Sequence, residues 1–247
     1  MTERLFVMLR PNAISHYGKW GPWHLPSKSK DGDWKPGAWM PPAHGPLSFD
    51  ENGYHLHRQT ILVYLLGFSI YEAEYRGGRI DAQSKLVVRK ARLIRKLETW
   101  TDQAARLFAC DCAEHVLHLF EEHNPDNPRP HRAIETARRY ALGYATPDLL
   151  EVAKEAVPHG ISVSGGAASE AAFAAAWCAG PENGRSWAIA RDVAWMAARG
   201  AAINEGMKIV SGNSVSLDER KWQTERLMEY LDGKVELGLA QSDPTSR

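Results

Sequence analysis

The spacing of apolar residues changes between Trp100 and Thr101. Before this point, apolar and polar residues alternate over short runs, which is typical of half-buried β-strands. After it, apolar residues recur every three or four positions, which is typical of amphipathic helices. Thr101 is a favoured N-cap residue and Asp102 suits a first helical turn, so a helix is expected to begin here. The pattern predicts an α+β fold, in which a small antiparallel sheet domain with a long Trp/Pro-rich loop precedes an all-helical bundle.

This boundary predicts an α+β domain over residues 1–100, a helical bundle domain over residues 101–235 and a flexible tail over residues 236–247. Residues 1–99 hold 15 basic and 9 acidic side chains, a net charge of +6, and residues 100–247 hold 15 and 21, a net charge of −6. Complementary charges of this size favour two halves that pack into one compact body. A basic half that faces an acidic partner is the alternative.

Four runs in the first half are predicted to be strands, over residues 4–9, 54–57, 69–77 and 85–97. Residues 58–66 fit a short helix, and Gly77–Gly78 is expected to form the turn after the third strand. The later part of the last run is also compatible with a helix. We predict a strand there, because another antiparallel strand closes the sheet over its apolar side chains.

Six helices are predicted in the second half, over about residues 102–123, 130–142, 147–157, 167–179, 184–204 and 216–232. Thr146, Pro147 and Asp148 form a strong start signal, with an N-cap, a proline at N1 and an acid at N2. Gly143 suits the C′ position after a helix.

A long irregular stretch, residues 12–52, is rich in proline and holds four of the nine tryptophans. A loop of this length is unusual in a compact domain unless it is functional or folds onto something. Four exposed indoles would be costly, so these side chains are candidates for binding a partner. They are Trp20, Trp23, Trp34 and Trp39.

The densest polar cluster lies on the first helix of the second half. Asp111 and His115 are four residues apart and share a helix face, where an aspartate stabilises a protonated imidazole. Cys112 is three residues from His115, and a cysteine–histidine pair of this kind is a candidate nucleophile.

A second interpretation of the same cluster is structural and is the one we favour. Here Asp111, Glu114 and His115 bond to arginines of the next helix and fix the helix packing, while the cysteines are small core residues. The arginines concerned are Arg129, Arg132 and Arg138.

A zinc site would use Cys110, Cys112, His115 and His118, whose side chains are of the types that zinc prefers. The two cysteines lie about 200° apart around one helix and cannot reach the same ion. We therefore expect no metal, and no motif indicates a cofactor.

Six basic residues and no acidic residue occupy the last strand of the first half. With tryptophans nearby, such a run is a candidate nucleic-acid site. A solvated strand face, or a docking surface for the acidic half, is the favoured alternative. The residues are Lys85, Arg89, Lys90, Arg92, Arg95 and Lys96.

Three cysteines form a sparse, odd set, which argues against a disulfide framework and predicts a reducing compartment. The N-terminal residues carry charges and no apolar segment typical of a signal peptide. The longest apolar run, residues 61–66, is far too short to cross a bilayer. The chain is therefore expected to be cytoplasmic, without membrane association.

The segment RLFACDCAEHVLHLFEEHNPDNPRPHRAIETARRYALG resembles the immunity-protein helical domain of bacterial polymorphic toxin systems. The resemblance covers about residues 103–232 and is most specific in this first block. It implies a helical domain that binds a toxin or another protein partner, rather than an enzyme. The matching residues are Asp111, Ala113, Glu114, His115, Val116, Leu117, Phe120, Arg129, Pro130, Ala133, Ile134, Ala137 and Arg138.

The first half resembles an uncharacterised domain of phage and bacterial proteins, through its Gly-x-His strand at Gly53, its Ile-Tyr-x-x-Glu strand at Ile70 and its basic strand. The order of these strands is similar to that of ADP-ribosyltransferase-like folds, in which His, Tyr and Glu grip a nicotinamide dinucleotide. By this analogy the weak catalytic candidates are His55, Tyr71 and Glu74.

Together these patterns predict a protein-binding module of phage or mobile-element type that neutralises or modulates a partner protein. The candidate binding residues are the four tryptophans and Asp111, Glu114, His115, Arg129 and Arg138. Two alternatives stay open: a nucleotide-using enzyme in the first half, and nucleic-acid binding through the basic strand.

Overall fold

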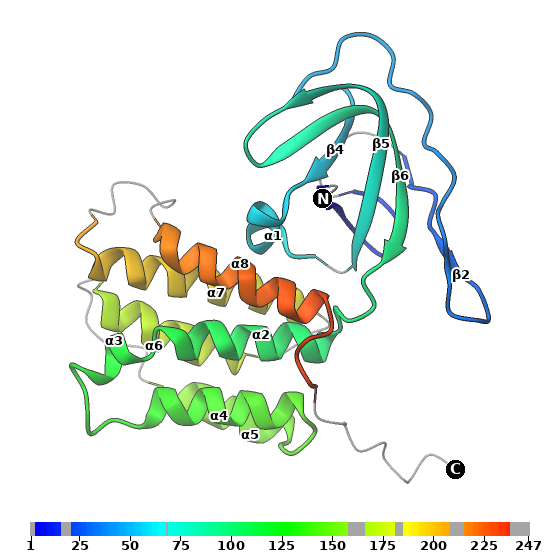
Figure 1. The fold of residues 1–247 in the computed structure, drawn as a ribbon. Coiled ribbons are helices and arrows are strands. Elements are labelled where there is room, and N and C mark those ends of the chain that lie inside the picture. Colours follow the sequence, from blue (N-terminus) through cyan, green and yellow to red (C-terminus); the bar gives the residue numbers. More distant parts are fainter. Residues whose placement is uncertain are drawn as a thin grey trace. The chain divides into compact units, whose positions relative to one another are not determined.

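The structure is a computed structural model that describes residues 3–15, 21–67, 69–157, 166–180, 185–207 and 215–237. The chain divides into two compact units, Met1–Trp100 and Thr101–Arg247. Among the described residues, the first unit holds six strands and one short helix, and the second unit holds seven helices (Figure 1). The predicted α+β class, with a small antiparallel sheet followed by helices, is confirmed.

Four antiparallel strands of the first unit form a closed barrel in the order β1-β4-β6-β5. Alternation along the strands sends apolar side chains such as Leu56, Val88 and Leu93 into the interior. Charged side chains such as Lys90 and Arg92 therefore lie on the outside. The strands are β1 (Leu5–Leu9), β4 (Tyr54–His57), β5 (Ser69–Asp81) and β6 (Lys85–Lys96).

The turn predicted at Gly77–Gly78 is wrong, because β5 continues through both glycines to Asp81. The pairing with β6 shifts register between Arg76 and Arg79, and Gly77 adopts a φ of +81°. Glycine tolerates this left-handed conformation, so the pair forms a bulge within the strand instead of ending it. The hairpin turns after Asp81, where the N–H of Ala82 donates to the carbonyl of Lys85 at 2.9 Å.

The long loop folds onto the barrel and takes the place of a strand along one edge of β6. The N–H groups of Gly37, Met40 and Ala43 donate to the carbonyls of every second β6 residue, at 3.0, 2.9 and 2.8 Å; the acceptors are Leu93, Ala91 and Arg89. A side chain at Gly37 would lie 2.1 Å from the carbonyl oxygen of His24, so this position requires glycine. Within the loop, β2 (Ser27–Lys28) and β3 (Trp34–Lys35) form a small antiparallel ribbon.

Three helices of the second unit begin directly after the residues expected at their starts. Thr101, Thr146 and Ser216 each accept a hydrogen bond from a backbone N–H in the first turn, at 3.1, 3.4 and 3.2 Å. The helices are α1 (Gln59–Leu65), α2 (Asp102–His115), α3 (His118–Glu121), α4 (Arg129–Ala141), α5 (Pro147–Ala156), α6 (Ala167–Cys178), α7 (Ser186–Asn204) and α8 (Leu217–Leu231).

The predicted single helix over residues 102–123 is wrong, because α2 ends at His115 and a separate α3 follows. The N–H groups of Leu117 and Leu119 bond three residues back, to Glu114 and Val116, both at 3.1 Å. This tighter turn redirects the chain and keeps Val116, Leu117 and Leu119 buried.

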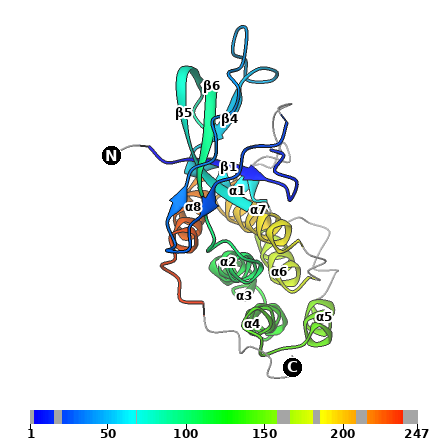
Figure 2. The same ribbon diagram turned by 90° about the vertical axis from the view of Figure 1, so that its right-hand side faces the viewer.

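Helix α2 is the centre of the second unit and packs against α4, α6, α7 and α8 (Figure 2). Helices α6 and α7 approach closely through alanines and one glycine. A side chain at Gly200 would lie 3.2 Å from the Cβ of Glu170 on α6, which shows how near the two backbones are. In the part of the chain that the structure describes, no helix is long and apolar enough to cross a membrane.

Candidate functional site: the groove between α2 and α8

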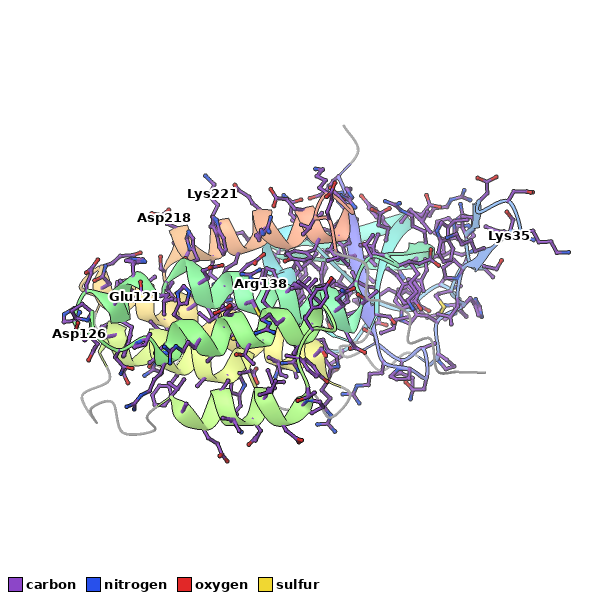
Figure 3. The ribbon with its side chains drawn as sticks, turned by 90° about the horizontal axis from the view of Figure 1, so that it is seen from below. Lys35, Glu121, Asp126, Arg138, Asp218 and Lys221 are labelled. Carbon is purple, nitrogen blue, oxygen red and sulfur yellow. The ribbon has the colours of Figure 1, made fainter. Side chains whose placement is uncertain are left out.

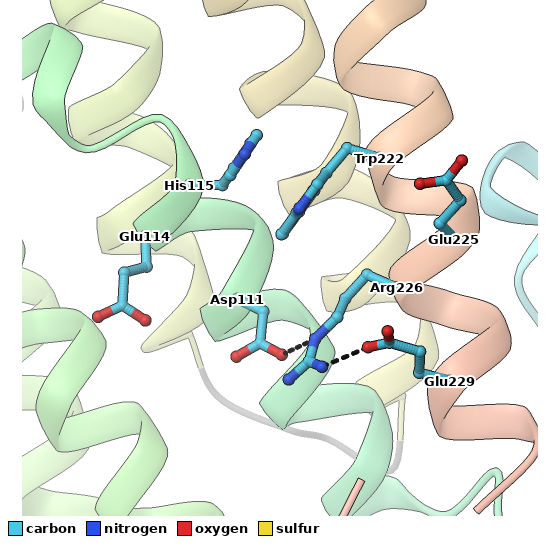
Figure 4. A pocket seen from close by; sticks show the side chains of 7 residues that line it. All are labelled: Asp111, Glu114, His115, Trp222, Glu225, Arg226 and Glu229. Carbon is cyan, nitrogen blue, oxygen red and sulfur yellow. Dashed lines mark hydrogen bonds and ion pairs between the residues drawn. The ribbon is translucent and has the colours of Figure 1, made fainter. Parts of the chain in front are cut away.

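Helices α2 and α8 form the walls of an open pocket of about 410 Å³, here called the α2–α8 groove (Figure 4). Its lining is mostly charged, and its residues come from one turn of α2 and two turns of α8. They are Asp111, Glu114, His115, Trp222, Glu225, Arg226 and Glu229.

Asp111 forms the floor of the groove and is only 8% exposed. Its Oδ1 accepts a hydrogen bond from Arg138 of α4 at 2.8 Å. Its Oδ2 accepts bonds from the Nε of Arg226 at 2.8 Å and from the Tyr230 hydroxyl at 2.7 Å, both on α8. One buried carboxylate therefore ties three helices together.

The pKa values of the groups around Asp111 keep these bonds in place. Burial and the neighbouring Asp111 carboxylate raise the pKa of Tyr230, so its hydroxyl remains a donor. Burial disfavours the charged form of Arg138, but its hydrogen bond to Asp111 raises the pKa overall. Arg226 behaves in the same way, with hydrogen bonds to Glu229 and Asp111 that outweigh burial.

The predicted bonds to arginines of the next helix are only partly correct. Arg138 joins Asp111 to Glu114, whose Oε2 it reaches at 2.6 Å, and it projects from α4 (Figure 3). Arg129 and Arg132 do not take part, since they line a separate hollow at the start of α4.

His115 bonds to a glutamate of α8 rather than to an arginine. Its Nδ1 lies 2.6 Å from the Oε2 of Glu219, which is almost fully buried. Its ring stacks on Trp222 with centroids 3.7 Å apart and planes 3° from parallel (Figure 4). The predicted pairing with Asp111 is not what orients the imidazole.

Glu219 is held in turn by a buried polar chain. The amide of Gln223 donates to the Oε1 of Glu219 at 2.8 Å and to the Ala194 carbonyl of α7 at 2.9 Å. Arg220 donates to the Oε1 of Gln223 at 2.9 Å. A histidine on the rim is thus fixed by a network that reaches the core, which gives the groove a rigid wall.

The mouth of the groove is acidic. Glu114, Glu225 and Glu229 extend toward solvent, while Arg226 bonds to Glu229 at 2.5 Å. Four carboxylates and one guanidinium occur in the lining, so these five groups together carry a net charge of −3. When Arg138, which bonds to Asp111 and Glu114, is included, the net charge is −2.

The cysteines are core residues, as the structural interpretation predicts. Cys110, Cys112 and Cys178 are reduced and fully buried. Burial, followed by the Glu219 and Asp111 carboxylates, raises the pKa of Cys112 well above its usual value. Its thiol stays protonated and does not suit nucleophilic catalysis. No group of three or more His, Cys, Asp or Glu side chains suited to a metal ion occurs among the described residues.

The three catalytic candidates of the first unit do not come together. Tyr71 lies in the barrel interior, whereas Glu74 lies on the outside and bonds to Arg92. His55 is opposite Val87 on β6. Because Val87 and Arg92 are five residues apart, His55 and Glu74 are separated by about 16 Å along the strand.

The predicted tryptophans differ in their surroundings. Trp23 is 4% exposed and packs edge-on against Tyr54 at 5.4 Å, so it is a core residue and is not available for binding a partner. Trp34 and Trp39 are partly exposed beside cations. Trp20 lies outside the described residues.

Several side chains of the basic strand are engaged locally. Lys85 donates to the Phe49 carbonyl at 3.1 Å, Arg89 to the Ala43 carbonyl at 2.6 Å, and Arg95 to Glu72 at 2.7 Å. Arg92, which lies beside Trp39, bonds to Glu74, so most cations of this strand have a local partner.

The buried His57 should make the first unit less stable at acidic pH. Burial, the neighbouring His55 and Lys85 lower its pKa from 6.5 to about 4. His57 in the unfolded chain binds a proton more readily than the buried His57 of the folded chain. The stability that neutral His57 allows is therefore fully present above about pH 6.5 and is lost as the pH falls toward 4. We expect a loss of up to about 3 kcal/mol in the free energy of unfolding across this range.

Urea unfolding at a series of pH values measures this loss. His57→Gln should flatten the profile between pH 6.5 and 4, whereas His131→Gln, at an exposed site on α4, should leave it unchanged. A profile that is as steep in His57→Gln as in the wild type would contradict the assignment.

The sequence patterns did not identify the α8 residues of the groove as part of a site. Glu219 and Trp222 fall in a block that resembles the helical family, but nothing in their spacing indicates contact with α2. Arg226 and Tyr230 reach Asp111 across 115 and 119 residues of chain. Such partners are found only when the helices are packed.

The comparisons with known proteins agree with the helical resemblance. Residues 95–230, more than half of the chain, match the family described as "Imm-5 like putative immunity protein". No curated protein and no solved structure matches the chain. The groove and the polar network that supports it lie within the matched residues. The chain belongs to the Imm-5 like immunity protein family.

Proposed function

We propose that this protein neutralises a toxin by binding it, and that the α2–α8 groove is the contact surface. Family membership supports toxin neutralisation. The observation that supports the groove is its combination of a fixed His115–Trp222 stack with solvent-facing carboxylates of Glu114, Glu225 and Glu229. Aromatic anchors supported by rigid neighbours are the usual centres of protein interfaces.

The charge of the groove indicates the chemistry of the partner. A net negative pocket favours a toxin that presents lysine or arginine at its contact. A cationic side chain entering between Glu114 and Glu225 would meet carboxylates and the edge of the stacked rings. Because the helices are already tied together by Asp111, little ordering is needed when the partner binds, which favours tight association.

A growth experiment tests this function. The tagged chain is produced in bacterial cells, and proteins that co-purify with it in stoichiometric amount are identified by mass spectrometry. Each captured protein is then expressed alone and together with the chain. We expect the captured partner to arrest growth alone and the chain to restore it. Recovery of no stoichiometric partner across hosts, or of a partner without toxicity, would contradict the proposal.

Matched variants localise the contact. Replacing three groove glutamates with glutamine should abolish the growth rescue, since it removes three charges at the mouth. The same change at three exposed glutamates elsewhere should preserve it. The groove variant is Glu114→Gln, Glu225→Gln and Glu229→Gln, and the control is Glu122→Gln, Glu135→Gln and Glu155→Gln. Equal rescue by both variants would exclude the groove as the contact.

The phage or mobile-element setting, the cytoplasmic location and the domain limits at residues 100 and 235 stay predictions. The nucleotide-using enzyme has little support, because His55, Tyr71 and Glu74 lie on different sides and positions of the barrel.

A further inference from the structure

A cluster of cations surrounds one tryptophan on the outside of the barrel. The guanidinium carbons of Arg76 and Arg92 lie 4.5 and 4.7 Å from the ring centroid of Trp39, and the Lys90 ammonium lies 5.9 Å from it. Arg76 on β5 is directly opposite Lys90 on β6. Three chain segments therefore build this group, here called the Trp39 cluster: Trp39, Arg76, Lys90 and Arg92.

The positive charge of the Trp39 cluster is only partly compensated. Arg92 bonds to Glu74. Among the described residues, neither Arg76 nor Lys90 has a carboxylate within ion-pair distance, and Arg76 is exposed. Two cations on a solvent-facing surface are thus available to an anionic ligand.

The charge excess continues along the same face of the sheet. One carboxylate, Glu72, is shared by two arginines, with Arg95 bonding at 2.7 Å and Arg4 at 2.5 Å. Together with the Trp39 cluster this makes five cations and two carboxylates, a net charge of +3. The whole face is therefore a positive strip with an aromatic group at one end.

We propose that this face binds single-stranded nucleic acid, with phosphates on Arg76 and Lys90 and a base stacked against the Trp39 ring. Proteins that bind single strands without sequence preference combine a positive track with stacking platforms. The face provides both within a few ångströms. This site lies in the first unit and does not depend on the groove function.

An acidic protein is the competing ligand, and the geometry favours it less. Interfaces between proteins centre on apolar or aromatic side chains that become desolvated in pockets. Two guanidinium groups lie 4.5 and 4.7 Å from the centroid of the partly exposed Trp39 ring, so an incoming ligand meets an aromatic ring among cations instead of an apolar pocket. A polymer of phosphates and planar bases matches such a surface better than a carboxylate-bearing peptide does.

Fluorescence anisotropy of labelled oligothymidylate and oligouridylate with the full-length protein tests the proposal. We expect binding at low salt that weakens as the salt concentration rises. The logarithm of the association constant should fall with the logarithm of the salt concentration, with a slope of about −0.7 for each phosphate contact. The double variant Arg76→Gln and Lys90→Gln should weaken binding about tenfold or more. It should also make this slope less negative by about 1.4, because two phosphate contacts are lost. Trp39→Leu should weaken binding by removing the stacking platform.

A matched control removes the same charge elsewhere: Arg132→Gln with Arg139→Gln, both exposed on α4, should bind as the wild type does. The proposal is overturned if no oligonucleotide binds at low salt, or if the control loses affinity as much as the Trp39-cluster variant. It is also overturned if polyglutamate of matched charge displaces the oligonucleotide as effectively as an unlabelled oligonucleotide, since this would assign the face to acidic proteins.

Discussion

Asp111→Ala is expected to destabilise the helical unit by about 3–5 kcal/mol, because its buried carboxylate accepts three hydrogen bonds from other helices, each worth about 1–3 kcal/mol. The substitution leaves the Arg138 and Arg226 guanidiniums and the Tyr230 hydroxyl without their shared acceptor. Arg138 and Arg226 would keep their exposed partners Glu114 and Glu229, but the connection between α2, α4 and α8 through one carboxylate would be lost. Urea unfolding followed by far-UV circular dichroism measures the loss.

Glu114→Gln is the matched control for this prediction. Glu114 binds the same arginine at 2.6 Å, but its side chain is 56% exposed. Exposed ion pairs contribute less than about 1 kcal/mol, so this variant should unfold close to the wild type. Similar losses in the two variants would show that Asp111 is not the central connection between α2, α4 and α8.

Arg106→Met is expected to cost about 2–5 kcal/mol, because two buried carbonyl groups lose a donor. Arg106 lies on α2 with none of its surface exposed. Its Nη1 donates to the carbonyls of Cys178 and Gly180 at 2.7 and 3.1 Å, and its guanidinium lies 5.1 Å from the Tyr140 ring. The cation thus stabilises the C-terminal end of α6, where helix carbonyls are unpaired and the dipole is negative.

The same unfolding experiment on Arg132→Met provides the control, since Arg132 is exposed on α4. Methionine is similar in length to arginine and fills most of the space, so the comparison isolates the lost hydrogen bonds and charge. A change below about 0.5 kcal/mol in Arg106→Met, the size typical of neutral surface substitutions, would contradict this role.

The sequence predicts local structure well where the cause is local. Thr101, Thr146 and Ser216 indicate helix starts because a hydroxyl at an N-cap satisfies a backbone N–H of the same turn. The strand predicted over residues 85–97 is confirmed as β6, although the spacing of its later part also fits a helix, because pairing with β5 and β4 buries its apolar side chains in the barrel.

Predictions were wrong where long-range pairing outweighs a local signal. Gly77–Gly78 looks like a turn, yet the length of β6 allows β5 to pair beyond it and convert the glycines into a bulge. The helical pattern of α2 runs past His115, but burial of Leu117 and Leu119 is better served by a sharp turn.

The sequence locates the α2 half of the groove and misses the α8 half. Its α2 residues form a visible polar cluster, and their sharing of a face follows from helical spacing. Their partners on α8 are determined by how the helices pack, and the spacing of residues within one helix does not indicate this packing. Arg129 was a plausible partner because it lies on the next helix, but α4 presents Arg138 to Asp111 instead.

The most direct test of the central claim is the affinity of the captured toxin for the full-length protein, measured by isothermal titration calorimetry. The groove variant, with glutamine at Glu114, Glu225 and Glu229, should weaken binding about tenfold or more, as loss of complementary charge at an interface does. The variant with glutamine at Glu122, Glu135 and Glu155 should bind as the wild type. Unchanged affinity in the groove variant would contradict the α2–α8 groove as the surface through which this protein neutralises its partner.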